Sequence, residues 1–256
     1  MKKLLLAALI VLLASNVKAG YRDLNSITWW KTATFDDVVK QAKEYPDNIN
    51  KVDYLGYTAL HYASRYGDFS SFKLILKATK DVSLVTNLKN GWSTIMQAAA
   101  SNRDGKQKVE ALIKAGADVM AQDEYGFSAL HISMVFNKNE SSEIIQILLN
   151  AGADLMARTR DGDTPLHHAS WPKEAEVLIK NGAKVTARNE SGLTPLHVAA
   201  LSAATKQGLV EVLLEAGSDP NAKDKFGYDP WYYVEFYGHL KGTKSYWALN
   251  DARFNN

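Results

Sequence analysis

Apolar residues along most of the chain follow the spacing of short amphipathic helices that occur in pairs. In the first helix of a pair a large apolar residue is followed three positions later by a small one, as with Leu196 and Ala199. Residues at this separation share one helical face, so the helix can approach its neighbours closely. A second apolar stretch follows, for example Ile144 to Leu148. The pattern predicts repeated pairs of antiparallel helices.

Glycine and helix-capping residues give this pattern a period. The glycines ahead of the first helices are Gly56, Gly91, Gly126, Gly162, Gly192 and Gly227, separated by 35, 35, 36, 30 and 35 residues. Two positions after each glycine stands Thr, Ser or Asp. The side-chain oxygen of these residues can accept a hydrogen bond from an unpaired backbone N–H group of the first helical turn. The 30-residue spacing predicts a tight turn in the fourth unit, with Pro172 opening its second helix. One helix pair cannot bury its apolar face alone, so the copies are expected to stack.

The helix-start motifs resemble the ankyrin repeat family. The strongest matches are Gly162 to Ala169 (GDTPLHHA) and Gly192 to Ala199 (GLTPLHVA). The residues that carry the resemblance are Thr58, His61, His131, Thr164, Pro165, Leu166, His167, Thr194, Pro195, Leu196 and His197. The resemblance implies an all-α repeat solenoid, an ankyrin-like stack of helix pairs with short extended fingers. It also implies that the concave face and the finger tips bind other proteins.

The domain boundaries follow from the repeats and from the N-terminal segment. Lys2 and Lys3 precede the apolar run 4–14, and Ala19 ends a site that suits a signal peptidase, which predicts a signal peptide over 1–19. The run is too short to span a bilayer, so no membrane insertion is expected after cleavage. The resemblance then implies that residues 20–256 form a single ankyrin-repeat domain: an N-terminal cap (20–50), five repeats (51–224), and a degenerate repeat with a C-terminal cap (225–256). The leader looks bacterial, which favours the periplasm, with an extracellular location as the alternative.

Charge and cysteine content exclude several functions. The chain has 30 basic and 28 acidic residues, and loss of Lys2, Lys3 and Lys18 with the leader leaves a net charge of −1. A near-neutral surface gives no reason to expect nucleic acid or an anionic membrane as a partner. The absence of cysteine excludes disulfides, thiolate metal sites and a cysteine nucleophile.

The histidines and acids predict neither an enzyme nor a metal or cofactor site. Four of the six histidines, His61, His131, His167 and His197, occupy the same repeat position, where we expect the imidazole to tie the loops of adjacent units together. His167 and His168 are adjacent on a helix and do not face the same way, so they do not form a metal site. The protein is interpreted as non-enzymatic, with no catalytic residue and no cofactor.

Positions that the repeat leaves variable are the candidates for binding another protein. The residue after a finger glycine is Tyr57, Trp92 or Phe127 in the first three units. Further candidates on the fingers and the helix ends are Tyr54, Arg65, Tyr66, Tyr125 and Phe136. Aromatic residues and Arg are enriched at binding hot spots, so one hypothesis is a strip that grips a partner protein. The alternative is that these rings only pack against neighbouring fingers.

A second aromatic group lies in the C-terminal unit. It comprises Trp231, Tyr232, Tyr233, Phe236, Tyr237, Tyr246 and Trp247. A bulky cap that closes the stack is one interpretation, and a glycan- or peptide-binding platform is the other. The chain is thus expected to be a monomeric protein–protein interaction scaffold of the bacterial envelope, with a secreted effector that engages a host protein as the main alternative.

Overall fold

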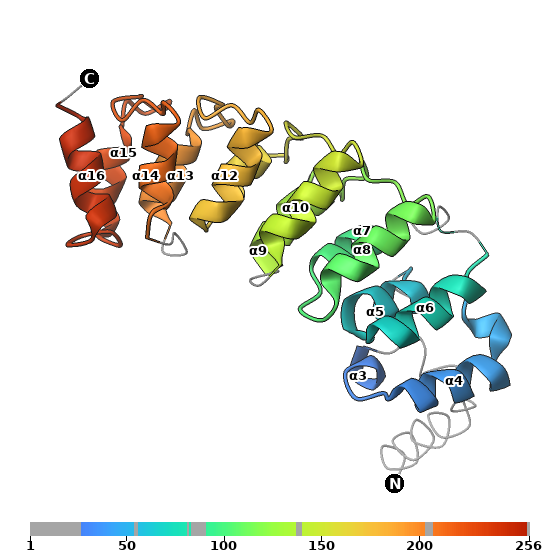
Figure 1. Ribbon diagram of the computed structural model, residues 1–256. Helices are drawn as coiled ribbons and strands as arrows, with labels where there is room; N and C mark the ends of the chain where they lie inside the picture. Colours follow the sequence, from blue (N-terminus) through green and yellow to red (C-terminus); the bar gives the residue numbers. More distant parts are fainter. Residues whose placement is uncertain are drawn as a thin grey trace, which may run out of the picture.

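The chain folds into a row of helix pairs. The computed structural model describes residues 27–53, 56–80, 82, 91–136, 140–202 and 207–254. Over these residues the helix pairs follow one another in sequence order along a curved array (Figure 1). This part of the chain contains no strand, and an isolated bridge joins Gln122 and Ser128. The expected all-α repeat solenoid is confirmed.

Six helix pairs, units 1 to 6, follow the six glycines. Their first helices are α5 (Ala59–Tyr66), α7 (Thr94–Ala99), α9 (Ala129–Phe136), α11 (Pro165–His168), α13 (Pro195–Leu201) and α15 (Pro230–Tyr237). Their second helices are α6 (Phe69–Ala78), α8 (Gly105–Lys114), α10 (Ser141–Asn150), α12 (Pro172–Lys180), α14 (Leu209–Glu215) and α16 (Lys244–Ala252). Each first helix packs on the next first helix and each second helix on the next second helix. The units therefore share one continuous core.

Local sequence signals explain where these helices begin and end. Thr164 and Thr194 cap α11 and α13, and Pro165 and Pro195 occupy the first helical turn, where a missing N–H costs nothing. The second helices of units 2 to 5 are followed by glycines with a positive φ of 86° to 99°, which side chains other than glycine rarely adopt. In unit 4, α11 has only four residues and Pro172 opens α12. The predicted tight turn is confirmed.

The core is built from the large and small residues of the first helices. Leu60, Leu130 and Leu196 are fully buried, and the small residues Ala63 and Ser133 beside them have no exposed surface. Apolar residues of the second helices complete the same cluster. Because one pair buries only one face of each helix, the cluster extends through the described units without a break.

Helix pairs also form both ends of the array. Ahead of unit 1, α3 (Ile27–Trp30) packs on α5, and α4 (Phe35–Glu44) packs on α6. Thr34 and Asp37 form a capping box at the start of α4, and a one-turn 3-10 helix, η1 (Pro46–Asn48), follows. Trp30 is buried against Gly67, where an added Cβ would lie 3.0 Å from the ring. No helix in the described part of the chain is long and apolar enough to cross a bilayer.

Candidate functional site

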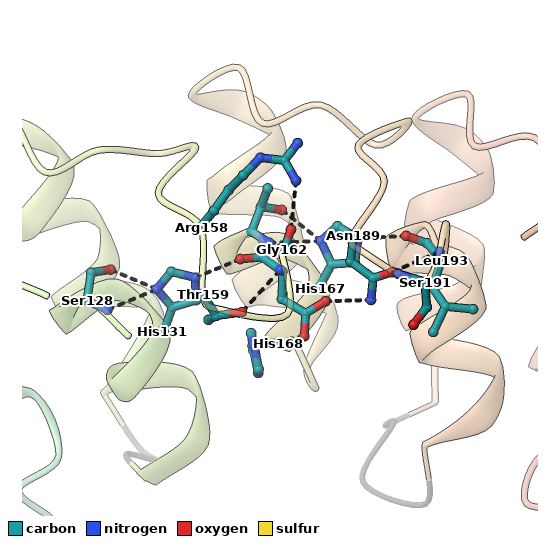
Figure 2. Close-up of polar contacts among 12 residues, drawn as sticks. Ser128, His131, Arg158, Thr159, Gly162, His167, His168, Asn189, Ser191 and Leu193 are labelled. Carbon is teal, nitrogen blue, oxygen red and sulfur yellow. Dashed lines mark hydrogen bonds and ion pairs between the residues drawn. The ribbon is translucent and has the colours of Figure 1, made fainter. Parts of the chain in front are cut away.

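Histidines stand at the start of the first helices in units 1, 3, 4 and 5, and three of them bond to the following unit. In units 1, 3, 4 and 5 the imidazole Nδ1 accepts the backbone N–H of the capping Thr or Ser at 3.0 to 3.1 Å. Nδ1 is therefore unprotonated, and Nε2 carries the ring proton. Nε2 donates to a carbonyl of the following finger, as Figure 2 shows for two of them: His131 to Asp163 O (3.3 Å), His167 to Leu193 O (3.0 Å) and His197 to Tyr228 O (3.2 Å).

Burial keeps these rings neutral. It lowers the pKa of His131 to about 3, with a contribution from the neighbouring His168, and it also lowers the pKa of His167 and His197. The neutral tautomer is the one that the hydrogen bonds require. Both nitrogens of each ring are engaged, so these three histidines hold the stack together and leave no nitrogen for a substrate.

A second set of ties joins the fingers, and sequence reasoning missed it. Arg158 Nη1 donates to Gly162 O (2.8 Å) in its own finger and to Arg188 O (2.9 Å) in the next finger. Gln122 and Arg188 make the equivalent pair of bonds from their own fingers. The signal was present, because each of the three donors stands four residues before a finger glycine.

The glycines at these finger tips allow the close approach. A Cβ at Gly126 would lie 2.7 Å from Arg158 O, and a Cβ at Gly162 would lie 2.9 Å from Glu190 N. Both glycines also have a positive φ, 79° and 78°. A side chain at either position would therefore separate adjacent fingers as well as strain its own backbone.

His168 and Asp163 form the pair most suggestive of chemistry. His168 Nε2 lies 3.4 Å from Asp163 Oδ2, and Asp163 Oδ1 accepts from Asn189 Nδ2 at 2.8 Å. The Phe127 ring covers His168, with centroids 5.1 Å apart. The Asp163–Asn189 bond thus joins the fingers of units 4 and 5. Within the described residues, no three or more His, Asp or Glu side chains are grouped so that they could hold a metal ion.

The three aromatic residues that follow the first finger glycines are half-buried, and each packs on a neighbouring ring. Tyr57 contacts His61, with centroids 5.0 Å apart. Phe127 contacts both His131 and His168. Trp92 makes an edge-to-face contact with Phe136, with centroids 4.9 Å apart. Tyr57 thus contacts a ring of its own unit, whereas Trp92 and Phe127 each reach a ring of the following unit, Phe136 and His168.

The two remaining finger tyrosines are Tyr125 and Tyr54, of which the structure describes only Tyr125. Tyr125 is exposed at the tip of the third finger, and the Arg160 guanidinium lies 5.3 Å from its ring centroid. Tyr54 lies outside the described residues.

Arg65, Tyr66, Trp92 and Phe136 form one group, which we call the cation–aromatic cluster. The Arg65 guanidinium lies 5.4 Å from the Phe136 ring centroid and 5.9 Å from that of Tyr66. These residues come from units 1, 2 and 3. Unit 2 carries the small, buried Ala100 and Ser101 at the positions that Arg65 and Tyr66 hold in unit 1. Because these two side chains of unit 2 are small, the longer side chains of units 1 and 3 can contact each other.

The C-terminal unit carries a different aromatic arrangement, which we call the aromatic stack: Tyr228, Tyr232 and Phe236. Tyr228 and Tyr232 lie parallel with centroids 3.8 Å apart, and Phe236 stacks on Tyr232 at 5.9 Å. The exposed fraction of Phe236 is 69% and that of Trp247 is 57%, whereas Trp231 is half-buried against Tyr246 and Arg253. The expectation that bulky residues close the end of the stack holds only for part of this group.

Comparison with known proteins agrees with the repeat architecture. A family model described as "Ankyrin repeats (3 copies)" matches residues 71–159, 95–189 and 133–224. Over 107 residues the chain is 31% identical to the ankyrin repeat and SAM domain-containing protein 6 of Rattus norvegicus, which is 42% of this chain and 12% of that protein. Over 109 residues it is 35% identical to the neurogenic locus notch homolog protein 1 of Xenopus laevis, which is 43% of this chain and 4% of that protein.

The chain therefore matches only a small part of the length of these relatives. The likeness covers the repeats themselves, whose helix pairs, capping residues and histidine ties are described above. Ankyrin repeats are in general modules of protein–protein interaction, and they are typically non-enzymatic. With a family model matched across residues 71–224 and the same repeated ties in the structure, this chain belongs to the ankyrin repeat family.

Proposed function

We propose that the protein is a binding scaffold of the bacterial envelope that holds a partner protein on the first helices of units 1 to 3. The observation that carries this proposal is the cation–aromatic cluster. Three consecutive units contribute to it, and Phe136 has an exposed fraction of 38%. A surface with a partly exposed aromatic residue beside an Arg is typical of the centre of a protein interface. Tyr125 at the third finger tip lies outside the cluster as a further contact.

Export is the second part of the proposal. It is supported by the basic start, the apolar run 4–14 and the cleavage site after Ala19. Expression of the full chain in a Gram-negative host, followed by fractionation and mass spectrometry, tests it directly. The expected product is periplasmic and begins at Gly20. Recovery in the culture medium would favour the secreted-effector alternative, and a cytoplasmic chain that still begins at Met1 would contradict export.

The binding experiment compares two exposed phenylalanines at the ends of first helices. Mature protein, Phe136→Ser and Phe236→Ser are used as baits on the native envelope fraction, and the captured proteins are quantified by mass spectrometry. We expect one protein to be retained by the wild type and by Phe236→Ser and lost with Phe136→Ser. Because both side chains are partly exposed, neither substitution is expected to unfold the array, and circular dichroism checks this.

The opposite result would point to the C-terminal unit. A partner lost with Phe236→Ser alone would contradict the proposed surface. For a glycan the Tyr228–Tyr232 pair is a poor platform, because the two rings lie parallel and each covers one face of the other. A sugar ring would have to pack on one of those faces. Capture of the protein on a glycan array, lost with Trp247→Ala, would favour that alternative.

A further inference from the structure

Among the described residues, the Arg65 guanidinium is a cation without an acid partner. In the part of the chain that the structure describes, no carboxylate lies within 4.0 Å of it, and its buried Nη1 has no hydrogen-bond acceptor. The Phe136 and Tyr66 rings lie close to the guanidinium and keep water from part of it. The residue as a whole remains partly exposed. Arg65 is therefore partly desolvated and still reachable from solvent.

Two acids that follow α5 in the chain, Asp68 and Asp104, bind other groups. Asp68 Oδ1 accepts Ser71 N at 2.8 Å, and its Oδ2 lies 3.8 Å from Arg103 Nη2. Asp104 Oδ2 accepts Phe69 N at 3.0 Å. These carboxylates cap the second helix of unit 1 and tie unit 2 to it. Moving either one to Arg65 would leave a backbone N–H without its acceptor.

Two further cations add to the positive charge at this position. Lys31 Nζ lies 5.8 Å from the Tyr66 ring centroid. Lys108 is fully buried under the end of α5, where Nζ donates to Ser64 O at 3.2 Å and to Ser101 Oγ at 3.1 Å. The local balance of charge therefore favours an anion.

We infer that Arg65 receives a carboxylate of the partner protein, an Asp or Glu side chain set next to an apolar residue that packs on Phe136. A guanidinium forms paired, charge-assisted hydrogen bonds with a carboxylate, and these are stronger where water is excluded. The two rings hold the guanidinium in place before binding, so little side-chain freedom is lost. This inference rests on the proposed function, because it assigns the chemistry of the partner to the same surface.

The test begins with a random 12-residue peptide library displayed on phage and selected on the mature protein. We expect the enriched peptides to carry Asp or Glu beside an aromatic or aliphatic residue. The best peptide is then synthesised with its acid and with the matching amide (Asp→Asn or Glu→Gln). Both peptides are titrated against wild type, Arg65→Gln and Arg65→Lys by calorimetry.

The expected result is a coupling between the peptide acid and Arg65. The amide peptide should bind wild type at least about tenfold more weakly than the acid peptide does, and Arg65→Gln should bind both peptides within about twofold of each other. Arg65→Lys should keep part of the preference for the acid, because it retains the charge and loses the planar fork. The control is Arg103→Gln, whose side chain is 64% exposed beside Asp68 and which should leave both affinities unchanged.

Several results would overturn the inference. A neutral or basic consensus, the absence of any enriched peptide, or an equal preference for the acid in wild type and Arg65→Gln would each do so. A loss of the preference in Arg103→Gln as well would show an effect of overall charge rather than of Arg65. Phe136→Ser separates the two proposals. Binding that Phe136→Ser abolishes but Arg65→Gln does not affect leaves the proposed surface intact and refutes the carboxylate. Binding that neither variant affects refutes both.

Discussion

Unit 2 contacts its neighbours through different chemistry from that which joins units 3 to 6. From unit 3 onward, His131, His167 and His197 each donate to a backbone carbonyl of the next finger. In unit 2 the histidine position is held by the buried Met96. A buried lysine of the second helix, Lys108, instead contacts the end of α5.

The aromatic surfaces of the two regions differ in the same way. In units 1 to 3 the Tyr66 and Phe136 rings lie beside Arg65, a cation without an acid partner in the described residues, and Trp92 packs on Phe136. In unit 6 the rings stack on one another, and the neighbouring Glu235 is paired with Lys241 at 3.2 Å. In unit 6 the exposed aromatic rings pack on one another and the neighbouring charges are paired. In units 1 to 3, where the sequence departs from the repeat at unit 2, the Arg65 guanidinium is left available for a partner.

The largest expected difference between the two regions is in their loss of stability at acid pH. The folded-state pKa of His131, His167 and His197 lies below its unfolded value, so below about pH 6.5 the unfolded chain binds protons that the folded chain does not. We expect stability to fall as the pH falls, by at most about 1.4 kcal/mol per pH unit for each such histidine. Glu174, whose pKa burial raises, should offset part of the loss. The measurement is urea unfolding at pH 6.5, 5.5 and 4.5.

The control for acid unfolding is His131→Asn. In this variant the number of protons taken up on unfolding at acid pH should be smaller by about one, so the free energy of unfolding should depend less steeply on pH. Hydrogen exchange, corrected for intrinsic rates, locates the effect. The amides of units 3 to 5 should lose protection before those of units 1 and 2. Equal loss in both regions would contradict the contrast between them.

The arginine tie between fingers should give the next largest effect. Arg158→Ala removes two bonds to carbonyls, Gly162 O and Arg188 O, and we expect a loss of about 2 kcal/mol. The matched control is Arg160→Ala, whose guanidinium lies over the exposed Tyr125 ring and should contribute less than about 1 kcal/mol. The midpoints of urea unfolding of the two variants measure these two losses of stability. Equal losses would show that the fingers are not held by this tie.

Alkaline pH should act on the N-terminal region. Burial lowers the pKa of Lys108 to about 8, below its unfolded value near 10.4. Between these values the folded chain has released the proton that the unfolded chain still holds. Stability should therefore rise with pH from about 8 to 10, by at most about 1.4 kcal/mol per pH unit. Urea unfolding of Lys108→Met over the same range should lack this rise, and a rise of the same size in the variant would assign it to another group.

The aromatic stack should be the least sensitive site. Phe236 is mostly exposed and contacts Tyr232 and Tyr237 on its own helix. We expect Phe236→Ser to change the free energy of unfolding by less than about 1 kcal/mol. Thermal unfolding measures it. A larger loss would mean that the stack closes the end of the array as a cap does.

Several features of the fold could be read from the chain because their causes are local. A Thr or Ser that caps a helix, a Pro in its first turn and a Gly with positive φ after its end each act within a few residues. Because these capping residues, prolines and glycines recur along the chain, the sequence predicted the repeat units, their stacking and the repeat position of the histidines. The role of Arg158 was also within reach, since it shares its distance from the finger glycine with Gln122 and Arg188.

The sequence alone therefore determined the family and the repeated frame, but not which variable residues meet. Tyr57, Trp92 and Phe127 occupy the same repeat position, yet Tyr57 contacts a ring of its own unit, whereas Trp92 and Phe127 each contact a ring of the following unit. The Arg65–Phe136 contact spans unit 2, which carries the small, buried Ala100 and Ser101 at the equivalent positions. Contacts between residues about 70 positions apart are set by the packing of three helices, and no local propensity encodes them. The tertiary structure decided the candidate binding surface for this reason.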